Sequence, residues 1–511
     1  MNWSHGYHVS TGYSFGHYRE MAPDWMRFGA LLNGYRAAPP DQPFRYLELG
    51  CGQGFALAQL AAAFPHAEFL GVDFNPEHIA QARRFALAAG LENIRFEEAD
   101  IAELAKQWPA DYGRFEYVAL HGLYSWVSPP LRRAVVSCLG AACLPGALVY
   151  LSYNSMPGWV AGMVVQRLVY GLQQQSPQRS PAQVLQQGAE LLEGLIQAKA
   201  KVAAALPTLS ARLEGLKSHP SSYLVHEYLH EHWQPLWHSQ VAAELHAAKL
   251  IPVGSATLPE NYLPALLQPE LAQLIGQGEG RAMQQTLIDL AINQSFRRDL
   301  FCRGARHASR STQELAQSWL LARQGLDRRQ REVMTGFGGL DLPQELLDAV
   351  VDALESGSER IGTLAVRGPF AQRPIHELLQ IVALLLHAGR VGLAIEHLPA
   401  ARVRKFNRAV VRAALDESLP YGALLAAATA TAREARDFEL ALYPLVAGGA
   451  IPLEPPALAV QLRDRLLASG RALLKDGQVL QEPAAELAQA QVLVDEFLKD
   501  TLPDWQRQGV V

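Results

Sequence analysis

The sequence is poor in cysteine and in charged side chains, and both shortages limit what the chain can be. Its 511 residues include four cysteines whose spacing matches no metal-ligand pair: Cys51, Cys138, Cys143 and Cys302. We therefore expect no metal site and reduced, mostly buried thiols. Charged residues make up 19% and hydrophobic residues 49%, which excludes a disordered or fibrous chain. The net charge of −5 argues against general binding to nucleic acid.

The sequence also lacks a long uninterrupted apolar run. The longest apolar stretch, 378–395, is broken by Gln380, His387 and Arg390, so no membrane insertion is expected. The N-terminal residues are aromatic and polar and lack the apolar core of a signal peptide. We therefore predict a cytoplasmic protein.

The first third of the chain alternates between short apolar runs and amphipathic stretches. Strands are predicted at 44–49, 68–72, 94–97, 117–120 and 147–153, and helices at 55–64, 78–89 and 131–139. This alternation predicts an α/β fold in which helices cover both faces of a parallel sheet.

After residue 160 the composition favours helices. We predict a helical insertion at about 172–220, then a strand within 221–233, a helix at 238–249 and a strand at 251–257. Residues 263–335 are expected to be helical, with the arginines between 297 and 310 on a solvated helix face.

The C-terminal half is predicted to be mainly α-helical. A winged-helix-like unit is expected near 340–398, and helices are expected from 401 to 511. The chain then divides into an N-terminal α/β domain at 1–262, a middle domain at 263–400 and a C-terminal helical domain at 401–511.

A glycine-rich turn follows the first predicted strand. Glu48 comes just before Gly50, Gly52 and Gly54, and a predicted helix follows. Glycines permit a tight turn and let the backbone approach a ligand closely. The third glycine comes one position earlier than in dinucleotide-binding sites, and a carboxylate before the turn suits a cation better than a diphosphate. The turn therefore favours S-adenosylmethionine, which carries an ammonium and a sulfonium but no phosphate.

Further polar residues stand at the ends of the next predicted strands. Asp73, followed by Phe74, ends the second strand and can accept the two ribose hydroxyls. Asp100 and Ile101 end the third strand, where they can bind the adenine amino group and cover its ring. His121 ends the fourth strand, beneath the expected methionine part of the cofactor.

These motifs resemble those of a known family. The runs ELGCGQG, GVDFNP and EAD are similar to class I S-adenosylmethionine-dependent methyltransferases. The runs GHYREMAP, HGLYSWVSP, YNSMPGW and HEYLHEHWQP resemble a bacterial subfamily with a methyltransferase regulatory domain. That subfamily includes the rickettsial outer-membrane-protein lysine methyltransferases.

The resemblance implies a Rossmann-like fold with a seven-stranded, mainly parallel sheet, a protein acceptor and a homodimer. We expect the cofactor to be held by ten residues: Tyr18, Glu48, Gly50, Gly52, Gly54, Asp73, Phe74, Asp100, Ile101 and His121. Tyr7, Tyr13 and Phe15 precede the first strand together with Tyr18 and are expected to close over the cofactor.

The sequence indicates the residues around the acceptor less clearly than those around the cofactor. We expect six residues there: His121, Tyr124, Trp126, Asn154, His226 and Tyr228. His121 is the best candidate for a general base, and the aromatic side chains suit an amine acceptor. Lysine in a protein is the leading substrate. A small-molecule O- or N-methyltransferase and a non-catalytic sensor of S-adenosylmethionine remain alternatives.

A possible zinc motif occurs at residues 226–230, where His226 and His230 match HExxH. On a helix this spacing places both imidazoles on one face. The surrounding alternation of polar and apolar residues favours a strand, on which the two side chains would stand far apart. We therefore predict no zinc site.

Overall fold

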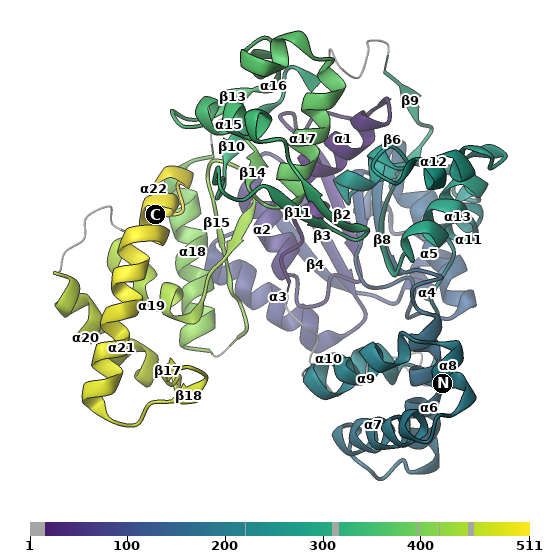
Figure 1. The fold of residues 1–511 in the computed structure, drawn as a ribbon, viewed down its shortest axis with the longest axis horizontal. Helices are drawn as coiled ribbons and strands as arrows, with labels where there is room; N and C mark the ends of the chain where they lie inside the picture. Colours follow the sequence, from purple (N-terminus) through teal and green to yellow (C-terminus); the bar gives the residue numbers. More distant parts are fainter. Residues whose placement is uncertain (1–15, 220, 309–315, 396–397, 418, 448–453) are drawn as a thin grey trace.

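The computed structural model describes residues 16–219, 221–308, 316–395, 398–417, 419–447 and 454–511 (Figure 1). Its centre is a seven-stranded sheet in the order β4-β3-β2-β5-β6-β8-β7. The strands are β2 (Arg45–Leu49), β3 (Glu68–Asp73), β4 (Ile94–Glu98), β5 (Phe115–Leu120), β6 (Cys143–Asn154), β7 (Leu250–Ser255) and β8 (Phe296–Arg303). The five strands predicted between residues 44 and 154 are confirmed.

Strands β2 to β6 run parallel, and β8 runs antiparallel to both of its neighbours, β6 and β7. The expectation of a solvated arginine helix at β8 is therefore wrong. Arg297 and Asp299 are two residues apart, so they lie on the same face of the strand. There they pair at 2.9 Å and are both buried. The expected N-terminal domain ends at residue 262, whereas the sheet takes its last strand from beyond that boundary.

Helices cover both faces of the sheet because the apolar residues of each strand alternate between the faces. One face packs against α1 (Pro23–Leu32), α2 (Phe55–Ala63) and α3 (Pro76–Ala89). The other packs against α4 (Ile101–Lys106), α5 (Pro129–Ala142) and α11 (His238–His246). Glu48 has Leu47 and Leu49 as neighbours on β2, and both of these leucines belong to the second face. Its side chain therefore points toward the first face.

A helical lobe follows β6 and projects from the sheet, at the lower right of Figure 1. It consists of α6 (Val160–Gln175), α7 (Pro181–Gln197), α8 (Lys201–Ala205), α9 (Leu209–Ser218) and α10 (Ser221–Tyr228). These helices share a separate apolar core. The predicted insertion is thus helical, but the helices begin earlier and end later than 172–220.

The strand expected within 221–233 is wrong, because this segment forms helix α10. Leu224, Val225, Tyr228 and Leu229 recur at helical spacing and are all buried in the core of the helical lobe. The short alternation of polar and apolar residues fits a strand and a helix equally well. In the helical form, the Tyr228 ring packs against the Trp159 ring, with the two ring centroids 6.3 Å apart.

The middle of the chain mixes helices with short strands. After α12 (Pro269–Gly276), α13 (Gly280–Ile292) and β8 come β10 (Leu320–Arg323), β11 (Glu332–Thr335), β12 (Gly338–Asp341), α15 (Gln344–Ala353), β13 (Glu359–Arg360), α16 (Ile361–Ala365), α17 (Ile375–His387) and β14 (Val391–Leu393). Strands β13, β10 and β14 form a sheet in that order. The expectation of helices alone for 263–335 is therefore only partly met.

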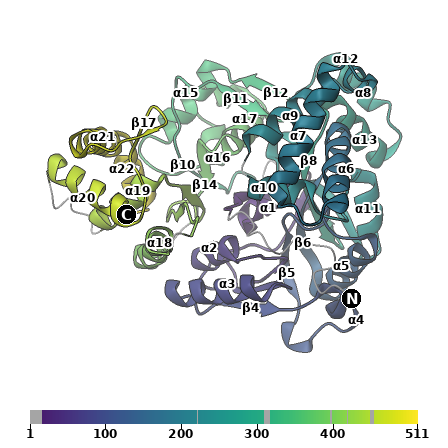
Figure 2. The same cartoon turned by 90° about the horizontal axis from the view of Figure 1, so that it is seen from below.

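The C-terminal lobe is mainly helical and docks onto the first face of the central domain. It contains α18 (Ala400–Leu415), β15 (Ala423–Leu425), β16 (Ala432–Glu434), α19 (Asp437–Val446), α20 (Pro455–Ala468), β17 (Leu474–Lys475), β18 (Gln478–Val479), α21 (Pro483–Glu496) and α22 (Leu502–Gln508). Figure 2 shows α18 beside α2 and α3. The Tyr421 ring stacks on Phe55 at 4.2 Å, and Arg402 donates to the carbonyls of Ala61 and Ala62.

The remaining short elements are η1 (Arg19–Met21), η2 (Ala110–Tyr112), η3 (Leu258–Tyr262), η4 (Gly368–Gln372), η5 (Phe497–Thr501) and the pair β1 (Tyr35–Arg36) and β9 (Arg306–His307). All four cysteines are buried and unpaired, as predicted. Within the described residues, no helix is both long enough and apolar enough to cross a membrane.

Candidate functional site

The glycine-rich turn connects β2 to α2, and its three predicted glycines all have positive φ angles, of 74°, 53° and 70° at Gly50, Gly52 and Gly54. A Cβ on Gly54 would lie 2.4 Å from the Phe96 ring, whereas a Cβ on Gly52 would meet no atom within 4 Å. Gly54 therefore serves the packing of α2 against β4. Gly52 borders open space, which leaves room for a ligand beside the backbone.

A cleft with about 840 Å³ of empty space lies at the carboxyl ends of β2, β3, β4 and β5, the edge where open α/β sheets bind ligands. Seven of the ten predicted cofactor residues line it: Gly50, Gly52, Asp73, Phe74, Asp100, Ile101 and His121. Trp126, predicted for the acceptor side, lines it as well. The structure thus brings together residues from four strand ends.

Two aspartates of the cleft are held in place by backbone donors. The two carboxylate oxygens of Asp73 accept the N–H groups of Gly52 and Asn75, each at 2.9 Å. Asp100 accepts the N–H of Ala102 at 2.7 Å and caps α4. Each carboxylate oxygen has a further lone pair. Both carboxylates are therefore oriented before a ligand with hydroxyl or amino donors arrives.

Glu48 is buried beneath the turn and does not line the cleft. Its Oε2 atom has no hydrogen-bond partner. Burial, and then the nearby Asp73, raise the pKa of Glu48 well above its ordinary value. A nearby ammonium would satisfy this carboxyl, and a phosphate would be repelled by its ionised form. The turn therefore fits the cationic end of the predicted cofactor.

His121 is enclosed by aromatic rings. Its ring stacks on Tyr18 with the centroids 3.6 Å apart, and its Nδ1 lies 3.0 Å from the hydroxyl of Tyr150. Burial, together with the positive charge of Arg298, lowers the pKa of His121 to about 3. The imidazole is therefore neutral at physiological pH and is too weak a base to take a proton from an ammonium.

Sequence reasoning missed five residues that line the cleft: His78, Gly122, Leu123, Val127 and Leu131. His78 lies 3.5 Å from the Asp73 carboxylate. The three apolar side chains recur every four residues after β5, a spacing that could have indicated one continuous apolar wall.

The acceptor side is formed where β5, β6 and α10 meet. The Trp126 indole N–H donates to the carbonyl of His226 at 3.1 Å. The Asn154 amide donates to Oε1 of Glu227 at 2.9 Å. These contacts bring three of the predicted residues, Trp126, Asn154 and His226, together with the buried Glu227.

Two predicted tyrosines do not line the cleft. Tyr124 is fully buried in the second face of the sheet and donates to Glu244 at 2.6 Å. Tyr228 packs in the core of the helical lobe, where burial raises its pKa to about 12. Tyr7, Tyr13 and Phe15 lie outside the described residues.

The HExxH segment does lie on and just after a helix, contrary to the expected strand. The rings of His226 and His230 are 5.6 Å apart. Among the residues that the structure describes, no group of three or more His, Cys, Asp or Glu side chains could hold a metal ion.

Two family models match the chain. Residues 41–139 match a methyltransferase domain, and residues 220–303 match a predicted methyltransferase regulatory domain. An uncharacterized protein of Synechocystis is 28% identical over 526 aligned positions that span all of both chains. A demethylmenaquinone methyltransferase of Thermus thermophilus is 37% identical over 158 positions, which cover 29% of this chain and 69% of that protein.

Among solved structures, PKMT2 from Rickettsia typhi superposes with a TM-score of 0.69 and covers 98% of this chain and 99% of its own. Its complex with AdoHcy superposes equally well. The sequence identities are 16% and 17%, so the comparison shows a shared fold along the whole chain.

Proposed function

Because the chain belongs to the S-adenosylmethionine-dependent methyltransferases, we propose that it methylates lysine side chains of a protein. The cofactor supplies a methyl group that is already activated by a positive sulfur. The chain's own task is therefore to bind and orient the two reactants and to exclude water. Asp73 and Asp100 would hold the ribose and adenine, Gly52 would leave room beside the turn, and Glu48 would attract the ammonium from beneath the turn.

The contact between Asn154 and Glu227 carries the proposal of an amine acceptor. Glu227 is buried, and its Oε1 accepts the Asn154 amide at 2.9 Å. A buried carboxylate held at the carboxyl end of β6 would attract an ammonium group and orient it toward the cofactor. Trp126 lines the cleft on the same side and offers an aromatic face to a cation. His121, by contrast, is proposed to position neighbouring rings and not to act as a base.

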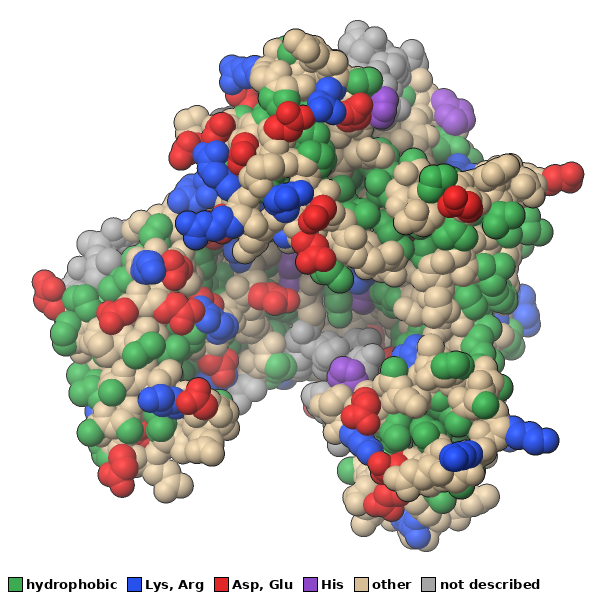
Figure 3. Space-filling model, viewed as in Figure 1, with side chains coloured by type: hydrophobic (Ala, Val, Ile, Leu, Met, Phe, Trp, Pro, Cys, Tyr) green, Lys and Arg blue, Asp and Glu red, His purple; other side chains and the backbone are tan. Residues whose placement is uncertain are grey.

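The shape of the molecule supports a protein acceptor over a small one. Figure 3 shows a broad gap between the helical lobe and the C-terminal lobe. The C-terminal half is also larger than a small-molecule enzyme usually needs. The fold that the chain shares with PKMT2 and the motifs that resemble lysine methyltransferases support the same acceptor.

We also propose a role for the segment near 340–398. The segment contains helices α15, α16 and α17 and strands β13 and β14, which pair with β10 from outside it, and we propose that it forms a winged-helix-like unit. Its role would be to dock a protein acceptor or to pack a homodimer. Division of the chain at residue 400 and a cytoplasmic location stay predictions.

The test is to incubate the full chain with labelled S-adenosylmethionine and a cell lysate. One half of the lysate is left native, and in the other half lysines are blocked by acetylation. We expect label in protein bands of the native half and none in the blocked half. Label found only in small molecules would contradict the proposal and favour the small-molecule alternative.

A matched pair of variants tests the acceptor side. Glu227→Gln should lower kcat/KM for the protein acceptor by about tenfold or more, because one hydrogen bond to a charged group is lost. Its affinity for S-adenosylhomocysteine should stay unchanged. Glu231→Gln, an exposed neighbour, serves as the control and should behave as wild type. Equal activity of the two variants would show that Glu227 does not bind the acceptor.

A further inference from the structure

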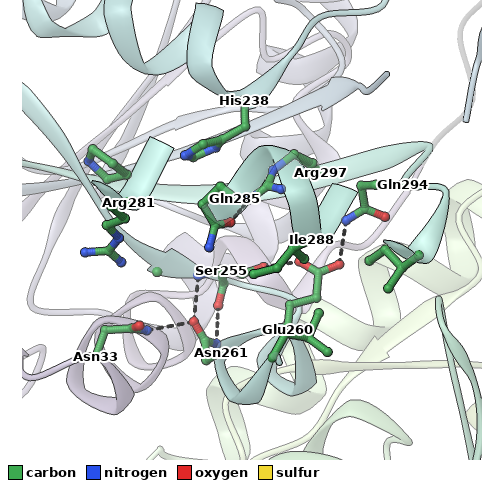
Figure 4. A pocket seen from close by; sticks show the side chains of 14 residues that line it. Asn33, His238, Ser255, Glu260, Asn261, Arg281, Gln285, Ile288, Gln294 and Arg297 are labelled. Atoms are coloured by element: carbon green, nitrogen blue, oxygen red, sulfur yellow. Dashed lines mark hydrogen bonds between the residues drawn. The ribbon is translucent and has the colours of Figure 1, made fainter. Parts of the chain in front are cut away.

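A second cavity lies between the ends of β7 and β8 and helix α13 (Figure 4), and two charged groups of its wall already have partners. Glu260 accepts hydrogen bonds from the Ser255 hydroxyl at 2.6 Å and from the Gln294 amide at 2.8 Å. Arg297 of β8 is buried and pairs with Asp289 of α13. Both charges therefore stabilise the elements that enclose the cavity.

A surface groove on the C-terminal lobe carries charges of one sign only. It lies between α18 and the end of α3, two helices that run side by side in Figure 2, and has about 980 Å³ of empty space. Four of its seven lining residues are basic and the other three are alanines. The basic residues are Arg404, Lys405, Arg408 and Arg412, and the last three of these are exposed. The groove thus presents positive charge beside small side chains.

Within the described part of the chain, none of these four basic side chains forms an ion pair. Exposed arginines elsewhere do have such partners, since Arg328 pairs with Asp352 and Arg373 with Glu345, each at 2.6 Å. Arg402, on the same helix as the groove residues, donates to backbone carbonyls of α2. The cations of the groove therefore lack the counter-charge that other surface arginines have.

Three of the four cations form a row along the helix. Arg404, Arg408 and Arg412 are four residues apart, so they lie on the same side of α18 at intervals of about 6 Å. In an extended chain, side chains on one face recur about every 6.6 Å. A segment with acidic residues at alternate positions therefore places one carboxylate opposite each arginine, and arginine binds a carboxylate through two parallel N–H groups.

We propose that this groove binds an acidic segment of a partner protein. No acidic side chain lines the groove to repel such a segment, because Asp416 and Glu417 follow at the end of α18 and lie outside the lining. Single-stranded nucleic acid fits less well, since grooves that bind it offer aromatic side chains for base stacking, and this lining has none. The net charge of −5 disfavours a long polyanion further.

The test measures the fluorescence anisotropy of a short labelled peptide in which glutamate alternates with serine. The full chain is used without cofactor, so the result does not depend on methyl transfer. We expect a Kd of about 1 mM or below at low ionic strength, and loss of binding at about 1 M salt because exposed charges are then screened. A peptide with lysine in place of glutamate should not bind. Absence of binding by the glutamate peptide, or equal binding of both peptides, would overturn the proposal.

Two double variants locate the binding. Arg408→Glu with Arg412→Glu reverses two exposed charges of the groove, so it should fold normally and weaken peptide binding by about tenfold or more. Arg133→Glu with Arg329→Glu makes the same change of net charge at exposed arginines outside the groove and should bind nearly as wild type. Equal affinity of the two double variants would place the peptide elsewhere and contradict the proposal.

A competitor distinguishes the class of partner. Oligothymidine with the same number of negative charges as the glutamate peptide is added to the bound complex. We expect it to displace the peptide less well than unlabelled peptide does, because the groove offers no aromatic face to its bases. Better displacement by the oligonucleotide would overturn the assignment to an acidic protein segment.

Discussion

At the scale of single residues, burial decides which titratable groups of the cleft carry charge. Glu48 and His121 both stand at the ends of strands, and burial shifts both toward their neutral forms. Asp73 and Asp100 are instead held by backbone N–H groups. The cleft thus combines oriented acceptors with one neutral imidazole, and a carboxyl with a raised pKa lies beneath its glycine-rich turn.

This assignment predicts proton release when the cofactor site is filled. Burial raises the pKa of Glu48 in the free protein, and the ligand's ammonium lowers it, so wild-type protein should release a proton on binding S-adenosylhomocysteine at a pH between these two pKa values. Glu48→Gln should release none and should bind about tenfold more weakly. Calorimetry in two buffers of different ionisation enthalpy measures this release. Glu68→Gln, exposed at the start of β3, is the control. Equal release by wild type and Glu48→Gln would be evidence against the assignment.

The enclosed His121 makes a prediction for stability. The pKa of His121 is about 3 in the folded chain and 6.5 ordinarily, so between these values the unfolded state binds a proton that the folded state does not. Stability therefore falls as pH falls below 6.5 and is unaffected above it. The loss of unfolding free energy from pH 7 to pH 5 should be about 1–2 kcal/mol smaller in His121→Gln.

Urea unfolding at the two pH values measures this difference. The exposed His246 supplies the control variant, His246→Gln, which should keep the acid sensitivity of wild type. If His121→Gln loses as much stability as wild type on acidification, His121 is not held neutral in the fold.

Most of the cofactor side of the site could be predicted from sequence because its residues follow strands directly. Asp73, Asp100 and His121 each end an apolar run, and parallel strands end at the same edge of the sheet. Glu48 and Gly54 come from the same motif, but one is buried under the turn and the other packs against Phe96. A linear motif does not distinguish ligand contact from support of the turn.

At the scale of elements, β8 shows why the second half of the sheet was harder to predict. Its arginines read as a charged surface, whereas Arg297 is only 4% exposed. The side chain is buried because Asp289 and Asp299 surround it. Asp289 lies on α13 and not on β8, so the sequence of β8 alone does not indicate that Asp289 pairs with Arg297. The same holds for α10, whose helical form depends on the core of a lobe assembled from distant helices.

The buried pair on β8 predicts a large loss of stability. Arg297→Ala leaves two buried carboxylates without their cation and should lower the unfolding free energy by about 3–5 kcal/mol. Arg328→Ala breaks exposed pairs with Asp348 and Asp352 and should cost at most about 1 kcal/mol. Denaturant unfolding of both variants measures the contrast. Similar losses in the two would mean that the β8 pair is not buried in solution.

At the scale of the whole molecule, the lobes are tied to the elements that build the cleft. The C-terminal lobe stacks Tyr421 on Phe55, the first residue of α2 directly after the glycine-rich turn. The helical lobe contacts Trp126, a residue of the cleft wall, through the carbonyl of His226. The chain's distant parts therefore bear on both the cofactor side and the acceptor side, an arrangement that the strand pattern of the first third does not reveal.

The carboxyl ends of the four strands β2 to β5 are proposed to hold the cofactor of this methyltransferase. Calorimetric titration of wild type and Asp73→Ala with S-adenosylhomocysteine tests it most directly. We expect micromolar binding by wild type, and binding weaker by about 1–3 kcal/mol in the variant, because the ribose hydroxyls and the Gly52 amide lose their acceptor. Unchanged affinity in Asp73→Ala would place the cofactor elsewhere and contradict the account.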